Sequence, residues 1–155
     1  MKNISFLLLI VICNSCRYSF DTRLQIVNNS DAIIYVGVSG EGYRNYNDTA
    51  YVYINCSTAQ HGDTYKFHPN TVKEFLLYIP WEEAFEDVYG NNILFYVFDA
   101  TVLETVPWEQ VKKEYLVLQR YDLSLQNLID LNWTLSYPPD ERMKDIKMYP
   151  PYGSE

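Results

Sequence analysis

The sequence ILFYVF, residues 93–98, is apolar at every position. A strand with one face in water alternates apolar and polar side chains, so an unbroken apolar run predicts a strand that is covered on both faces. We therefore expect residues 93–98 to form a central strand, with other parts of the chain packed on each side of it.

Shorter strand patterns lie on both sides of this run and are separated by turn-forming residues. The sequence NNSD, residues 28–31, is such a turn, and we expect it to join strands at 24–27 and 32–38 as a hairpin. A second turn, at residues 68–70, separates two later strands. The expected strands, in chain order, are residues 24–27, 32–38, 50–56, 63–68, 71–79, 93–98, 115–121 and 133–137.

Short helical patterns interrupt these strands at residues 80–88, 107–111 and 124–131. The first two begin with a proline, which suits the first turn of a helix, and Ser124 or Asp122 is the candidate N-cap of the third. Helices this few and this short do not supply the crossovers of a parallel sheet. The sequence therefore predicts a mainly β protein, an antiparallel β-sandwich (Ig-like or related) of about eight short strands with two or three short helices.

The chain has 155 residues, 48% of them hydrophobic and 21% charged, which suits a single globular domain. Its formal net charge of -8, with no run of Lys or Arg, disfavours nucleic acid as a partner. We divide it into a signal peptide at 1–15, a tether at 16–23, a β-sandwich domain at 24–137 and a Pro-rich tail at 138–155. The tail holds four of the seven prolines, so we expect it to be extended and on the surface, apart from one or two helical turns within 140–147.

The first residues have the organisation of a signal peptide. Lys2 gives a positively charged start, and residues 4–12 are apolar except for Ser5. This run is about half of the roughly 20 residues that span a bilayer, so it fits a cleaved leader better than a transmembrane helix. Two cysteines stand at its end, and one interpretation is ordinary secretion with cleavage near Ser15.

The end of the apolar run resembles a bacterial lipobox, in which a cysteine follows a small residue and signal peptidase II cuts before that cysteine. Ser15 fits the small position and Cys16 the lipidated position, whereas Cys13 and Asn14 depart from the usual pattern. The resemblance implies that Cys13 leaves with the signal peptide and that Cys16 carries fatty acyl chains such as palmitate. Two or more acyl chains hold a protein stably on a membrane. Membrane lipid is then the first expected partner, and the expected location is the cell envelope, at its periplasmic face or the cell surface.

Three further stretches carry a wider resemblance. They are LQIVNNSDAIIYV (24–36), LFYVFDATVLETVPWEQVKKEYLVLQRYDLSLQNLIDLNWTLSYPP (94–139) and KMYPPY (147–152). Together they are similar to a group of small lipoproteins of unknown function from Bacteroides-type gut bacteria. The resemblance implies a cell-envelope lipoprotein, and it transfers no functional residues to this chain.

The polar loop SGEGYRNYNDT holds the best binding candidates. Tyr43, Arg44 and Tyr46 lie close together in it, and exposed aromatic residues bind flat sugar faces or protein surfaces. The triplet Asp48-Thr49-Ala50 looks like the O-glycan acceptor of Bacteroides-type envelope proteins, with Thr49 as the acceptor. An envelope protein or a glycan is therefore the second expected partner.

Two common catalytic or cofactor-binding motifs are incomplete in this sequence. The segment GVSGEG, residues 37–42, misses a nucleophile elbow because Glu41 stands where glycine is required. It misses a dinucleotide-binding fingerprint because Asn45 stands where the third glycine is required. We therefore predict no catalytic residue and no cofactor.

The remaining reactive side chains also have structural interpretations. His61 and His68 match no standard zinc spacing, so we expect no metal. Cys56 shares an apolar strand face and is expected to be a buried, inert thiol, and the four acids within residues 80–88 are expected on the solvent face of their helix. The sequence favours a non-enzymatic domain with a binding, accessory or structural role. The alternative is an envelope hydrolase acting on glycan or peptide, which a cleft holding a histidine near an acid would favour.

Overall fold

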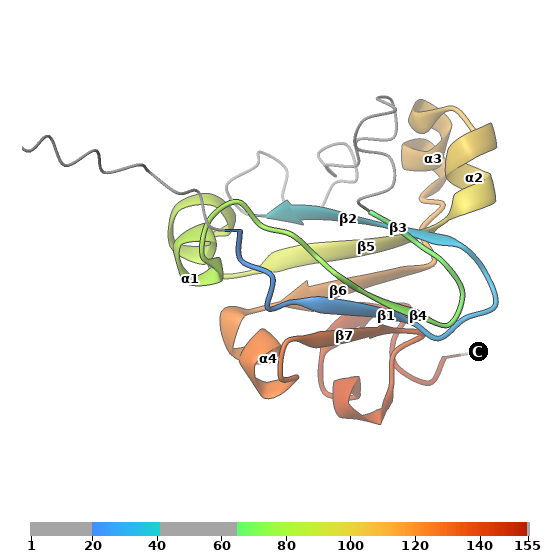
Figure 1. Ribbon diagram of the computed structural model, residues 1–155. Coiled ribbons are helices and arrows are strands. Elements are labelled where there is room, and N and C mark those ends of the chain that lie inside the picture. The colour runs from blue at the N-terminus through green and yellow to red at the C-terminus, as the bar shows by residue number, and fades with distance from the viewer. Residues whose placement is uncertain (1–19, 41–64, 155) are drawn as a thin grey trace, which may run out of the picture.

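The computed structural model describes residues 20–40 and 65–154, and in this part of the chain the strands form two sheets (Figure 1). The five-stranded sheet has the order β3-β2-β5-β6-β8, and the three-stranded sheet has the order β4-β1-β7. The strands are β1 (Gln25–Asn28), β2 (Ile34–Gly40), β3 (Lys66–Phe67), β4 (Thr71–Glu74), β5 (Ile93–Asp99), β6 (Gln119–Leu123), β7 (Thr134–Tyr137) and β8 (Lys147–Tyr149). Among them β1 and β7 pair in parallel, and the other neighbours pair antiparallel. The predicted mainly β class is confirmed, and the two antiparallel-rich sheets are consistent with a sandwich-like fold, although the β1–β7 pair departs from the predicted antiparallel arrangement.

Strand β5 is the central element that the run at residues 93–98 predicted. It pairs with β2 on one side and with β6 on the other. Its alternate side chains enter two separate hydrophobic cores: Ile93, Phe95 and Val97 face one core, and Leu94 begins the set that faces the other. An unbroken apolar run was required because both faces of this strand are covered.

The larger core lies between the two sheets, and the smaller one lies under two helices. In the larger core Phe75 packs edge-on against Phe95, with ring centroids 5.4 Å apart, and Trp81 is fully buried beside them. The smaller core is closed by α2 (Ala100–Thr105) and α3 (Trp108–Glu114), which Figure 1 shows beyond β2 and β5.

The three predicted helices are present. The first is α1 (Trp81–Ala84), which continues as the π-helical turn η2 (Phe85–Tyr89), the second is α3, and the third is α4 (Leu125–Asp130). Ser124 is the N-cap of α4 and forms a capping box with Asn127. Helix α2 was not predicted, because Thr101 and Val102 look like a continuing strand; Asp99 ends β5 by accepting a hydrogen bond from the Val102 amide at 3.1 Å.

The predicted hairpin of residues 24–27 and 32–38 is wrong. Strand β1 pairs with β4 and β7, whereas β2 pairs with β3 and β5, so the chain crosses from one sheet to the other between them. The buried Asn28 amide holds this crossing by donating to the carbonyls of Ala32 at 2.8 Å and of Phe67 and His68 at 3.1 Å. Because Asn28 is hydrogen-bonded to the distant residues Phe67 and His68, the turn at 28–31 does not have to pair the two strands that it connects.

The predicted strand at 115–121 begins later than expected. Tyr115 has a φ of 51°, the left-handed conformation that ends α3, so regular pairing begins at Gln119. The predicted strand at 50–56 lies outside the described residues.

The tail at 138–155 was predicted to be extended and on the surface, and the structure differs. Its helical turn is present as the 3₁₀ turn η3 (Glu141–Met143). Beyond it, β8 adds to the edge of the five-stranded sheet, with Met148 buried opposite Tyr121, and Met143 is fully buried as well. The apolar side chains between the prolines therefore pack into the main core.

Candidate functional site

The sequence-predicted site residues all lie outside the described ranges. They are Cys16, Tyr43, Arg44, Tyr46 and Thr49, together with Cys13, Cys56 and His61. His68 is described, and its side chain is exposed at the turn before β4. The hollow beside it is lined, among the described residues, by Lys66, Thr71, Val72 and Lys73, none of which is an acid.

The acidic face of α1 and η2 is placed as predicted. The side chains of Glu82, Glu83, Glu86 and Asp87 are exposed, while Trp81, Ala84 and Phe85 are buried. One of these acids, Glu82, is held by a residue from the start of the chain, and it leads to the most developed polar site of the described residues.

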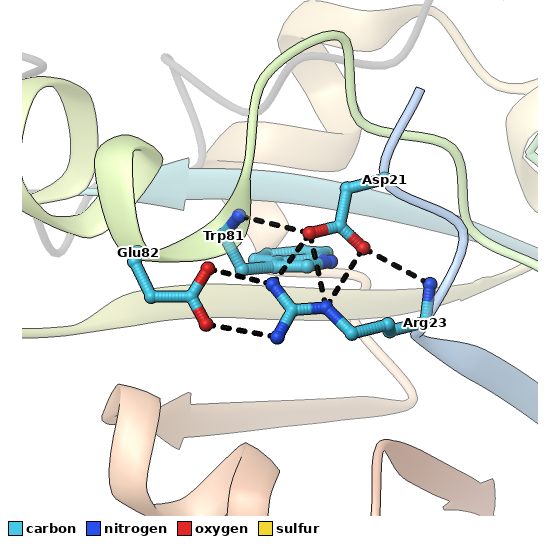
Figure 2. A network of polar contacts seen from close by, with 4 residues as sticks. All are labelled: Asp21, Arg23, Trp81 and Glu82. Atoms are coloured by element: carbon cyan, nitrogen blue, oxygen red, sulfur yellow. Dashed lines mark hydrogen bonds and ion pairs between the residues drawn. The ribbon is translucent and has the colours of Figure 1, made fainter. Parts of the chain in front are cut away.

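This site, which we call the tether-root cluster, consists of Asp21, Arg23, Trp81, Glu82 and Trp133. Figure 2 shows the first four of these residues. Asp21 and Arg23 belong to the last part of the predicted tether. Trp81 and Glu82 open α1, and Trp133 precedes β7. Three segments that are distant in the sequence therefore meet where the chain enters the folded domain.

Arg23 is the centre of the tether-root cluster. Its two terminal nitrogens donate to the two carboxylate oxygens of Glu82 at 2.8 and 2.6 Å, which is the fork geometry that guanidinium prefers. On its other edge Nε donates to Asp21 Oδ1 at 3.0 Å and Nη2 to Oδ2 at 2.6 Å. The guanidinium carbon also lies 4.1 Å from the centre of the Trp133 ring, a cation–π contact.

Asp21 joins this ion pair to the backbone of the domain. Its carboxylate accepts hydrogen bonds from the amide of Trp81 and from the amide of Arg23, both at 3.1 Å. The Trp81 amide is one of the donors at a helix start that no intrahelical acceptor satisfies. The main chain of Asp21 also exchanges two hydrogen bonds with that of Leu77, at 2.8 and 3.1 Å.

The electrostatics of the tether-root cluster favour the charged forms. Partial burial opposes ionisation of Asp21, but the hydrogen bonds from Arg23 and from the Trp81 amide outweigh it, and the pKa of Asp21 is lowered. The hydrogen bond from Arg23 lowers the pKa of Glu82, and in return Glu82 and Asp21 raise the pKa of Arg23. Both carboxylates therefore stay ionised at neutral pH with their oxygens occupied, so this arrangement serves as a latch that fixes the entry of the chain.

A second ion-pair group fastens the end of the chain. The Asp122 side chain is buried, with Lys147 Nζ 2.6 Å from Oδ2 and Arg120 Nε 3.3 Å from Oδ1. These contacts are ion pairs without the alignment of good hydrogen bonds. Arg120 Nη1 also donates to the hydroxyl of Tyr115 at 3.1 Å. The group connects β6 to β8, so its role is to hold the tail on the sheet.

Sequence reasoning did not find the tether-root cluster, since Arg23 and Glu82 are 59 positions apart. Within residues 20–40 and 65–154, no group of three His, Cys, Asp or Glu side chains comes together to hold a metal ion. Over the same residues no helix has the length and apolar character needed to cross a bilayer. Comparison of the chain with known protein families, with curated proteins and with solved structures found no match.

Proposed function

We propose that this chain is a membrane-anchored cell-envelope lipoprotein, attached through an acylated Cys16, whose β-domain has a non-enzymatic binding, accessory or structural role. The observation that carries the proposal is the apolar run at residues 4–12, which is followed closely by Ser15-Cys16. A leader of this length is too short to span a bilayer and fits a cleaved signal peptide.

The energetics of acylation support a stable anchor. Each buried CH₂ group contributes about 0.8 kcal/mol, and two or more acyl chains hold a protein on a membrane where one chain does not. The tether-root cluster is compatible with the same proposal, because its contacts at Arg23 fix the point where a tether anchored at Cys16 would join the domain.

Two finer proposals accompany the anchor. The loop residues Tyr43, Arg44 and Tyr46 are proposed to bind an envelope protein or a glycan, and Thr49 is proposed as an O-glycosylation site. The proposed test of the loop is a double Tyr43→Ala, Tyr46→Ala variant in a pull-down from native membranes, with loss of the captured partner as the expected result. We also propose that the two sheets pack as in an immunoglobulin-like sandwich, and their sandwich-like arrangement supports this proposal.

The experiment for the anchor compares three single variants in cells fed a fatty-acid analogue. Cys16→Ala is expected to lose the label and to move from the membrane to the soluble fraction. Cys13→Ala and Cys56→Ala are matched controls that remove the other two cysteines, and both are expected to keep the label. Labelling that persists in Cys16→Ala contradicts the assignment of the anchor.

A further inference from the structure

An exposed aromatic pair lies where the tether joins the domain. Phe20 is 51% exposed and Tyr78 is 61% exposed, yet their rings contact each other, with centroids 5.0 Å apart and planes tilted by 53°. Two large rings that contact each other while both face water present a joint apolar surface, and contiguous exposed apolar surfaces mark sites of interaction.

The apolar surface extends beyond the two rings. Tyr78 borders a hollow of about 220 Å³, whose described lining includes Leu76, Leu77 and Tyr89. The lining of this hollow is mainly apolar, and Leu77 is the residue whose main chain is bonded to Asp21. The pair is thus the edge of a larger apolar region beside the entry of the chain.

The pair is held in a fixed place. Asp21 follows Phe20 directly, and its main chain is bonded to Leu77, which precedes Tyr78. Its side chain is held by Arg23 and by the Trp81 amide. The main-chain pairing of Asp21 with Leu77 therefore places Phe20 beside Tyr78, at the point where the described part of the chain begins.

The short distance between Cys16 and Phe20 indicates which partner this surface faces. This step rests on the proposed function, because it assumes that Cys16 is acylated. Cys16 and Phe20 are four positions apart. A fully extended chain spans at most about 3.6 Å per residue, so the ring pair lies within roughly 14 Å of the acylated residue. The polar layer on each side of a bilayer is roughly 5 to 8 Å thick. An acyl anchor at Cys16 therefore keeps Phe20 and Tyr78 within reach of the lipid headgroups.

We propose that Phe20 and Tyr78 form a lipid-contact surface that rests among the headgroups and sets the orientation of the anchored domain. Tyrosine suits this position because its ring is apolar and its hydroxyl is polar, the combination enriched at membrane interfaces. Four exposed acids follow closely on α1 and η2, so the surface fits zwitterionic headgroups rather than anionic ones.

The register of the sheet supplies a matched control position. Leu77 is bridged to Asp21, whereas Val72 pairs with Val27 toward the far end of the β1–β4 ladder. At about 3.3 Å per residue, the six positions from Val72 to Tyr78 span at most about 20 Å. Val72 is 59% exposed, almost the same as Tyr78, so the two sites differ in place and not in exposure.

The test uses acylated protein purified from membranes and reconstituted into phosphatidylcholine vesicles. In a Cys56→Ser background, Tyr78→Cys and Val72→Cys each receive one environment-sensitive fluorophore. The expected result is a blue shift and strong quenching by headgroup-level nitroxide lipids for the label at position 78, and neither effect for the label at position 72. Equal quenching at both positions, or quenching at neither, overturns the proposal.

A second measurement needs no substitution in the folded domain. Hydroxyl-radical footprinting compares Tyr78 with Tyr149, which is 51% exposed and lies on β8. On vesicles Tyr78 is expected to lose reactivity relative to soluble Cys16→Ala protein, and Tyr149 is expected to keep it. Unchanged reactivity of Tyr78 in acylated protein overturns the surface alone, whereas a protein that carries no acyl chain and does not float with vesicles overturns the anchor and the surface together.

Discussion

Replacement of Arg23 tests whether the tether-root cluster is a latch. The substitution Arg23→Ala removes the ion pair with Glu82, the hydrogen bonds to Asp21 and the contact with Trp133 in one step. The remaining carboxylate of Asp21 keeps its bonds to two backbone amides. We therefore expect a partial loss of stability at neutral pH, with the fold retained.

The size of the expected stability loss follows from how exposed Arg23, Glu82 and Asp21 are. Arg23 and Glu82 are 41% and 54% exposed, so their pair contributes roughly 0.5 kcal/mol after screening by solvent. Asp21 is only 10% exposed, and its bonds to a charged group, discounted for the exposure of Arg23, contribute roughly 1 kcal/mol. The cation–π contact adds about 0.5 kcal/mol. The expected loss for Arg23→Ala is about 2 kcal/mol, and Glu82→Gln, the control that removes only the outer pair, is expected to lose about 0.5 kcal/mol.

The loss also depends on pH with a definite sign. The folded-state pKa values of Asp21 and Glu82 lie below their unfolded values, so the unfolded chain binds more protons in acid. The stabilisation is present above the unfolded pKa values, near 4, and is lost as the pH falls through the folded ones. Urea unfolding of Cys16→Ala protein, followed by tryptophan fluorescence, measures the difference between Arg23 and Arg23→Ala at pH 7 and at pH 3. The account is refuted if Arg23→Ala loses the same free energy of unfolding at both pH values. It is also refuted if the loss at pH 7 is no larger than that of Glu82→Gln.

Three further changes test the fold. Phe95→Ala empties the centre of the main core and is expected to lower the free energy of unfolding in urea by about 3 to 5 kcal/mol. The surface control Val72→Ala is expected to change it by no more than about 0.5 kcal/mol. Similar losses for the two variants would contradict the central place of β5. Lys147→Met removes one partner of the buried Asp122 and is expected to speed amide hydrogen exchange in β8 while β5 stays protected, so an unchanged β8 would count against its role. Ser124→Ala breaks the capping box of α4 and is expected to cost about 1 kcal/mol, or roughly 2 to 4 °C in Tm, against a few tenths of a kcal/mol for Ser124→Gly. A Tm unchanged by Ser124→Ala would contradict the cap.

The elements that the sequence predicted well are those whose signal is local. The run at 93–98 is apolar at every position because β5 is covered on both faces, and a helix start marked by Pro80 or Ser124 depends only on the next few residues. Such signals are complete within one window of the chain.

The elements that sequence reasoning missed depend on distant partners. The turn at 28–31 looked like a hairpin, but Asn28 bonds to the carbonyl of Phe67, 39 positions away. Met148 gave no strand signal between prolines, and it is buried only because β6 offers a free edge there. The tether-root cluster was missed for the same reason, because its partners are distant in the sequence and nothing near Arg23 points to Glu82.

The most direct test of the central proposal is mass spectrometry of the N-terminal peptide of protein extracted from membranes. The proposal predicts that the chain begins at Cys16 and that this residue carries the added mass of two or more fatty acyl chains. A chain that begins elsewhere, or one whose Cys16 is unmodified, would contradict it.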